Sequence, residues 1–124
     1  MKNVLGTDLK ICSKNPLTGY FRDGFCRTNN LDQGRHVVAS IMTDDFLKFS
    51  KSRGNDLSTP NRLFSFPGLK KGDKWCICAL RWKEAFQAGK APKVDLEATH
   101  EKALDYISID DLIKMSSSKT GRKS

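Results

Sequence analysis

Apolar residues alternate or run together in four short stretches of this chain, and these stretches predict β-strands. Residues 36–42 and 75–79 are apolar on both faces, which is typical of strands inside a sheet. Residues 94–98 alternate between apolar and polar positions, which predicts a strand with one exposed face. Residues 105–107 form a further short candidate. The pattern therefore predicts a sheet of about four or five strands.

Three helices are predicted by apolar residues spaced three and four positions apart and by residues that suit helix ends. Thr43 is a candidate N-cap for a first helix, which Gly54 would end. Residues 81–88 carry a helical apolar face and form the second candidate. Ser108 is a candidate cap for a last helix that extends to residue 115. These helices interrupt the strands, which predicts a fold that combines both kinds of element.

Two long segments, residues 1–34 and 55–74, lack periodicity and are rich in turn-forming residues. Loops of this length in a compact domain tend to be functional. We therefore predict an α+β fold: a single domain over residues 1–115, with a small mixed β-sheet, about three helices and two long ordered loops. The Ser- and Lys-rich residues 116–124 are expected to form a disordered basic tail.

The length and composition agree with this organisation and exclude several classes of protein. A chain of 124 residues with 38% hydrophobic positions can bury one core. No apolar run approaches the ~18 residues of a membrane span, and the first residues lack the apolar stretch of a signal peptide. We expect a soluble, cytoplasmic protein with no membrane association.

The net charge of +8 is unevenly placed along the chain. Residues 1–113 hold 18 basic and 14 acidic residues, a net charge of +4, and the remaining four bases lie at the C-terminal end. A nucleic-acid-binding domain more often carries its charge on a folded face with interleaved aromatic residues. Nucleic acid is therefore an unlikely partner.

The four cysteines are Cys12, Cys26, Cys76 and Cys78. Without a signal peptide the compartment is expected to be reducing, so all four are predicted to be free and mostly buried. Cys76 and Cys78 are two residues apart, a spacing that suits zinc poorly because on a strand it separates the Cα atoms by ~6.5 Å. No metal site and no cofactor are predicted.

Ten short motifs spread along the chain resemble one protein family. They are Asn3-Val4-Leu5-Gly6, Pro16-Leu17-Thr18-Gly19-Tyr20, Arg22-Asp23-Gly24-Phe25-Cys26, Gly34-Arg35-His36, Phe46-Leu47-Lys48-Phe49-Ser50, Gly54-Asn55-Asp56-Leu57-Ser58-Thr59-Pro60, Phe66-Pro67-Gly68-Leu69 with Gly72-Asp73-Lys74-Trp75-Cys76, Trp82-Lys83-Glu84-Ala85, and Leu96-Glu97-Ala98-Thr99-His100. In this order they are similar to a bacterial family known as domain of unknown function 2237. The resemblance covers roughly residues 3–113. It implies a single small soluble domain and supplies no catalytic residues, because the family has no assigned activity. Ala39 stands where the resemblance implies a frequent cysteine.

Polar residues beside the turns are the candidate binding residues. They are Arg22, Asp23, His36, Asn55, Asp56, Arg81 and His100. If the long loops meet, the Arg and His side chains would form a cluster of donors suited to a carboxylate or phosphate. The alternative is that each residue serves its own turn or a local ion pair.

Three classes of function remain open on the sequence. The first is the binding of a small molecule or anion in a loop-lined pocket. The second is an enzyme that uses a Cys/His pair, with Cys26 as the possible reactive thiol and His36 or His100 as its partner. The third is a protein-interaction module, which a flat apolar patch would favour.

Overall fold

The fold is that of a computed structural model, which describes residues 1–64 and 66–117. Strands and helices alternate after a long N-terminal segment that holds neither. In chain order the elements are β1 (His36–Ile41), α1 (Asp44–Ser52), the 3-10 helix η1 (Arg62–Phe64), β2 (Lys74–Cys78), α2 (Ala79–Gln87), β3 (Lys93–Val94), the 3-10 helices η2 (Leu96–Ala98) and η3 (Glu101–Asp105), and α3 (Ile109–Lys114). The α+β class and the single domain that the sequence predicts are confirmed.

Within residues 1–64 and 66–117 the sheet has three strands in the order β2-β1-β3, and both pairs of neighbours are antiparallel. Ala39 faces Cys76 across β1 and β2, and His36 faces Cys78 after a bulge between His36 and Val38. The prediction of a mixed sheet with four or five strands is therefore wrong. Strand β1 is central and buried, as its two apolar faces indicate.

The alternating stretch 94–98 is not a strand along its whole length. Strand β3 ends at Val94, and the chain then enters η2. The Thr99 hydroxyl donates to the Asp95 carbonyl oxygen (2.9 Å) and accepts from the Ala39 amide (3.1 Å), so it closes this turn against β1. Residues 105–107 are not a strand either, because η3 runs through Asp105. The apolar positions of these two stretches are buried or half-buried, as the pattern predicts, but their backbone is not that of a strand.

The helix caps follow the local sequence. Thr43 accepts a hydrogen bond from the Phe46 amide at the start of α1, and Ser108 accepts one from the Asp111 amide at the start of α3. Gly54 follows α1 with a φ of 89°, a left-handed conformation that glycine adopts at little cost. Both predicted N-caps are present in the structure.

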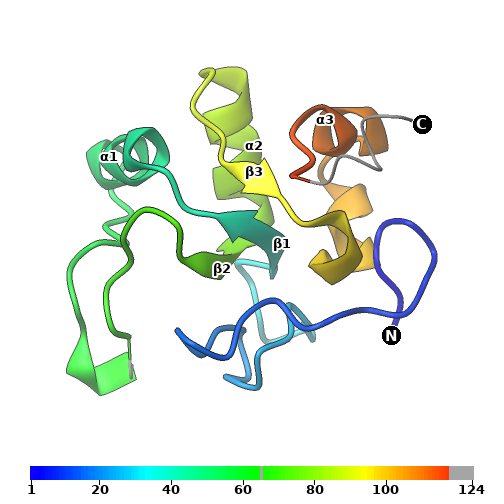
Figure 1. Cartoon of the computed structure of the whole chain (residues 1–124), viewed down its shortest axis with the longest axis horizontal. Coiled ribbons are helices and arrows are strands. Elements are labelled where there is room, and N and C mark those ends of the chain that lie inside the picture. The colour runs from blue at the N-terminus through cyan, green and yellow to red at the C-terminus, as the bar shows by residue number, and fades with distance from the viewer. Residues whose placement is uncertain (65, 118–124) are drawn as a thin grey trace.

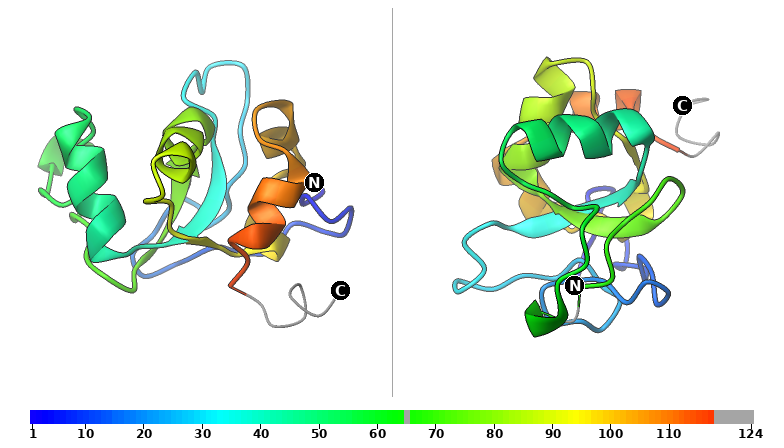
Figure 2. Two further views of the ribbon diagram at one scale, coloured as in Figure 1. Left: turned by 90° about the horizontal axis from the view of Figure 1, so that it is seen from above. Right: turned by 90° about the vertical axis from the view of Figure 1, so that its left-hand side faces the viewer.

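The three helices lie on one side of the sheet, and the N-terminal segment crosses the other side (Figures 1 and 2). The larger buried cluster fills the helix side and includes Trp75 and Trp82, with Phe86 packed against it. A smaller cluster of three cysteines and two alanines lies between the sheet and the N-terminal segment. The sheet therefore separates two cores of different chemistry.

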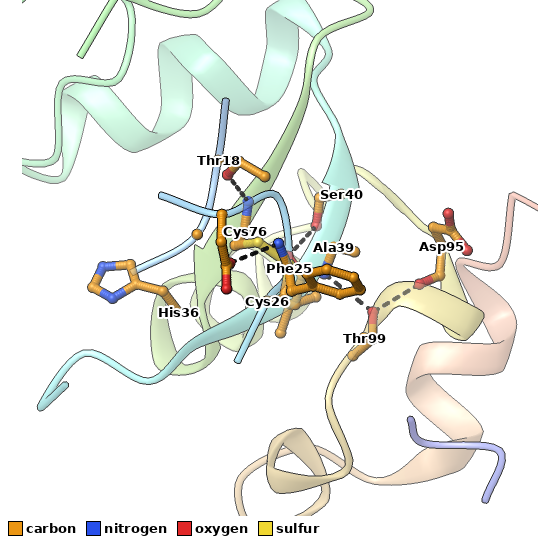
Figure 3. Close-up of a disulfide and its surroundings, with 12 residues drawn as sticks. Thr18, Phe25, Cys26, His36, Ala39, Ser40, Cys76, Asp95 and Thr99 are labelled. Carbon is orange, nitrogen blue, oxygen red and sulfur yellow. Dashed lines mark hydrogen bonds between the residues drawn. A yellow bond between two sulfur atoms is a disulfide. The ribbon is translucent and has the colours of Figure 1, made fainter. Parts of the chain in front are cut away.

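Two of the four cysteines form a disulfide, so the prediction of four free thiols is wrong. Cys26 of the N-terminal segment is bonded to Cys76 of β2, and their Cα atoms are 5.3 Å apart (Figure 3). Cys12 is a buried free thiol, and Cys78 is a half-buried one. The pairing depends on a contact between residues 50 positions apart, which the spacing of cysteines along the chain does not reveal.

The chain continues in contact with the domain beyond the predicted boundary at residue 115. The Ser117 amide donates to the Val94 carbonyl oxygen (2.9 Å), and Ser116 forms a parallel bridge with Val94. The rest of the predicted tail, residues 118–124, lies outside the described residues. Within the residues described, no helix has the length and apolar character that crossing a membrane requires.

Candidate functional site

A cavity of about 970 Å³ opens between the N-terminal segment and the long loop that follows α1. Its floor is the end of β2, residues 75–78. One wall comes from Gly19, Tyr20 and Arg22, and the opposite wall comes from residues of the 55–66 loop. The two long loops that the sequence analysis singled out therefore do face each other across one concavity.

Five of the predicted binding residues line this cavity, namely Arg22, His36, Asn55, Asp56 and Arg81. Asp23, His100 and Cys26 do not belong to its lining. The structure thus gathers residues from four separate segments, while the remaining three serve other purposes.

Arg22 joins the two walls of the cavity. Its Nη1 donates to the Gly19 carbonyl oxygen (2.7 Å), and its Nη2 donates to the Phe64 carbonyl oxygen (3.2 Å). The guanidinium carbon lies 5.1 Å from the centre of a Trp75 ring. The Nε atom is buried and has no hydrogen-bond partner among the described residues, and burial lowers the pKa of the side chain.

The backbone at Arg22 is held in an uncommon conformation. Its φ of 54° lies in the left-handed region, which a non-glycine residue seldom adopts. Gly19, at the start of the same turn, has a φ of 101°, and a Cβ there would collide with the Phe25 carbonyl oxygen. This turn therefore sets where the Arg22 backbone lies beside the cavity.

Arg81 and Asp56 are partly engaged within their own surroundings. The Arg81 Nη1 donates to the Arg53 carbonyl oxygen (2.9 Å) and lies 3.7 Å from a Glu84 carboxylate oxygen. Asp56 accepts hydrogen bonds from the hydroxyls and amides of Ser58 and Thr59. The Thr59 hydroxyl is the largest of the contributions that lower the pKa of Asp56 to about 2. The Asp56 carboxylate therefore stabilises the turn of its own loop.

His36 is oriented by a buried carboxylate that the sequence analysis did not single out. The Nδ1 atom of His36 lies 2.6 Å from Oδ1 of Asp32, whose side chain is fully buried. Asp32 also accepts from the His36 amide and the Thr28 hydroxyl, both at 3.0 Å. With Nδ1 on this carboxylate, the imidazole has Nε2 available for another group. The four-residue spacing from Asp32 to His36 was the available sequence signal.

Cys78 also lines the cavity, although the sequence analysis did not name it as a site residue. It is the last residue of β2 and the N-cap of α2, and its side chain makes no capping hydrogen bond. In the sheet register it is the Cα partner of His36. Both residues line the cavity, and the bulge between His36 and Val38 adjoins this pair.

The predicted residues outside the cavity have local roles. Asp23 pairs with Arg27, with 2.6 Å between Oδ2 and Nε, and accepts from the Phe25 amide. His100 caps η3 by accepting from the Lys102 amide (3.0 Å). Burial is the main cause that lowers the pKa of His100, which favours the neutral ring that this acceptor role needs. Cys26 is bonded to Cys76, so Cys26 is not a reactive thiol.

Aromatic and aliphatic side chains complete the cavity and were not predicted as site residues. Tyr20 stacks on His36, with 6.4 Å between ring centres, and Phe66 packs edge-on against Trp75 at 5.2 Å. Leu63 and Phe64, in η1, are 91% and 69% exposed at the edge of the cavity. The sequence places these residues in loops, where nothing indicates that they would face one another.

Comparison with known proteins supports the resemblance noted above. Residues 2–116 match the family described as "Uncharacterized protein conserved in bacteria (DUF2237)". No curated protein matches the chain.

Proposed function

We propose that this chain, which belongs to the DUF2237 family of bacterial proteins, binds a small organic anion with an apolar or aromatic body. The observation that carries the proposal is Arg22, whose guanidinium lies over Trp75 in the cavity lining and whose Nη1 and Nη2 each make one of the two hydrogen bonds that they can donate. An arginine with unused donors beside a concave apolar wall suits a carboxylate or a phosphate.

The rest of the lining favours an amphipathic ligand over a simple inorganic ion. Most of the named wall and floor residues are apolar or aromatic, and Arg81 adds a second cation. A body that packs on Tyr20, Phe66 and Trp75 would also cover the exposed η1 residues. The volume is within the ~300–1,000 Å³ of ordinary small-molecule sites.

The test is calorimetric titration with benzoate and phenyl phosphate as probes, and with benzyl alcohol as the uncharged comparison. We expect both anions to bind more tightly than the alcohol. Arg22→Gln should weaken anion binding by about tenfold to a hundredfold, the value of a charge-assisted hydrogen bond. Arg27→Gln is the matched control, because Arg27 lies in the same segment but outside the cavity lining. Equal effects of the two substitutions, or no preference for the anions, would refute the proposal.

An enzymatic role is the second candidate, and one observation favours it. Asp32 binds Nδ1 of His36, and Cys78 is the Cα partner of His36 in the sheet, so a carboxylate, an imidazole and a thiol come from adjoining positions. In this role the Cys78 proton passes to Nε2 of His36 while sulfur attacks an acyl carbon. The carbon–sulfur bond forms as the carbon–oxygen bond of the ester breaks, and Nε2 of His36 returns its proton to the alkoxide, which leaves as the alcohol.

The chemistry can be followed with 4-nitrophenyl acetate, which releases one coloured nitrophenolate for each acetyl group transferred. We expect one acetyl group per chain on Cys78, at a rate that His36→Gln lowers at least tenfold. Cys78→Ser should abolish the labelling. If His36→Gln reacts as fast as the unsubstituted protein, Cys78 is merely an accessible thiol and the enzymatic role is excluded.

A further inference from the structure

Three sulfur atoms from distant parts of the chain meet on the side of the sheet that faces the N-terminal segment. The Sγ atoms of Cys12, Cys26 and Cys76 all lie within 4.8 Å of one another. The three residues are 4%, 0% and 1% exposed, and they share one buried cluster with Ala39 and Ala98. Figure 3 shows the disulfide in this layer, between the strands and the N-terminal segment. The disulfide uses only two of the sulfurs and leaves the third, Cys12, as a buried free thiol.

Hydrogen bonds independent of the disulfide hold this cluster together. The Cys12 amide donates to the Gly24 carbonyl oxygen (2.7 Å), and the Cys76 amide donates to the Thr18 hydroxyl (2.9 Å). On the opposite side, the Thr99 hydroxyl accepts from the Ala39 amide. These bonds position Cys12 and Cys76, and the segment that carries Cys26, whether or not the two sulfurs are bonded.

We propose that, once the disulfide is reduced, Cys12, Cys26 and Cys76 form a three-thiolate site for a soft monovalent cation, Cu⁺. Metal–sulfur bonds of ~2.3 Å in a trigonal plane place sulfurs ~4 Å apart. The Cys12 sulfur already lies within 4.8 Å of the other two. Reduction must move the sulfurs of Cys26 and Cys76 apart, from bonding distance to this spacing. The inference concerns a different cluster from the anion cavity and does not depend on what binds there.

A dithiol is the reductant in this scheme. Its two electrons and two protons go to the sulfurs of Cys26 and Cys76, the bond between them breaks, and the dithiol closes into its own disulfide. Each thiol that binds Cu⁺ then releases its proton. Burial is the main cause that raises the pKa of Cys12 to about 12, so the metal must displace this proton, as metal ions do when they bind thiols.

The surroundings favour Cu⁺ over Zn²⁺. Zinc sites in proteins are almost always four-coordinate, whereas soft thiolate ligands also suit Cu⁺. No fourth Cys, His, Asp or Glu joins the three sulfurs in the part of the chain that the structure describes. The small side chains of Ala39 and Ala98 stand beside them instead. Ala39 is fully buried and is the Cα partner of Cys76, so a cysteine at position 39 would supply a fourth sulfur.

The proposal is tested on protein reduced with dithiothreitol and then freed of it, without oxygen. Competition with the Cu⁺ chelator bathocuproine disulfonate should show one Cu⁺ per chain, and X-ray absorption should show three sulfur neighbours. Cys12→Ser should reduce the neighbours to two and weaken binding at least tenfold. Cys78→Ser is the matched control, since Cys78 lies outside the cluster. This variant should bind Cu⁺ with the same stoichiometry, affinity and number of sulfur neighbours as the unsubstituted protein.

Ala39→Cys tests the geometry by a gain of function. The reduced variant should bind one Zn²⁺ per chain, at least tenfold more tightly than the unsubstituted protein. Circular dichroism of the reduced chain should retain the folded spectrum. The proposal is overturned if reduction unfolds the chain, if the folded reduced chain binds no stoichiometric Cu⁺, or if Cys12→Ser behaves like Cys78→Ser.

Discussion

Replacing both Cys26 and Cys76 by alanine should lower the free energy of unfolding by about 4 kcal/mol. The disulfide joins residues 50 positions apart, and closing a loop of that length in the unfolded chain accounts for a stabilisation of about this size. Urea denaturation of the oxidised protein and of the double variant, followed by tryptophan fluorescence, measures the difference.

The matched control for the disulfide is Cys78→Ala, which removes a free thiol from the same strand, β2. It should change stability far less than the double substitution. A thiol titration completes the test: denatured protein without reductant should show two thiols per chain, from Cys12 and Cys78. Four titrating thiols, or a double variant as stable as the control, would contradict the disulfide.

The second large effect is expected at Trp82, where replacement by alanine should cost about 3–5 kcal/mol, the range for truncating a buried aromatic side chain. Trp82 is 0% exposed, stacks on Phe86 with 5.2 Å between ring centres, and donates from Nε1 to the Pro92 carbonyl oxygen (3.3 Å). The substitution leaves a cavity at the centre of the larger core. The loss of free energy of unfolding is measured by the same urea denaturation.

Trp82→Phe separates packing from hydrogen bonding at this position. It keeps most of the aromatic volume but removes the donor to Pro92, so its cost should be well below that of alanine. A near-neutral Trp82→Ala would place the side chain outside the main core and would conflict with its burial.

Some residues of the candidate site could be identified from their neighbours in the chain, whereas others depend on contacts between distant residues. Turn positions identified Arg22, His36, Asn55, Asp56 and Arg81, because polar side chains collect where strands and helices end. The sequence could not separate them from Asp23 and His100, which stand at similar turns but are engaged by Arg27 and by Lys102. Asp32 and Cys78 were missed because their importance rests on a hydrogen bond to His36 and on the register between β1 and β2.

What the amino-acid sequence determined by itself is the set of local features. Thr43 and Ser108 reach amides three residues further along, so capping depends on neighbours in the chain. The apolar runs of β1 and β2 are long enough to identify buried strands without knowledge of their partners.

Tertiary structure alone decided the number of strands, the disulfide and the cavity. The stretch 94–98 turns into η2 where the Thr99 hydroxyl bonds both Asp95 and Ala39. Cys26 meets Cys76 because the N-terminal segment crosses the sheet on the side away from the helices. Each of these outcomes depends on contacts between residues far apart in the chain. Those contacts are set by how the whole chain packs, and no local pattern encodes them.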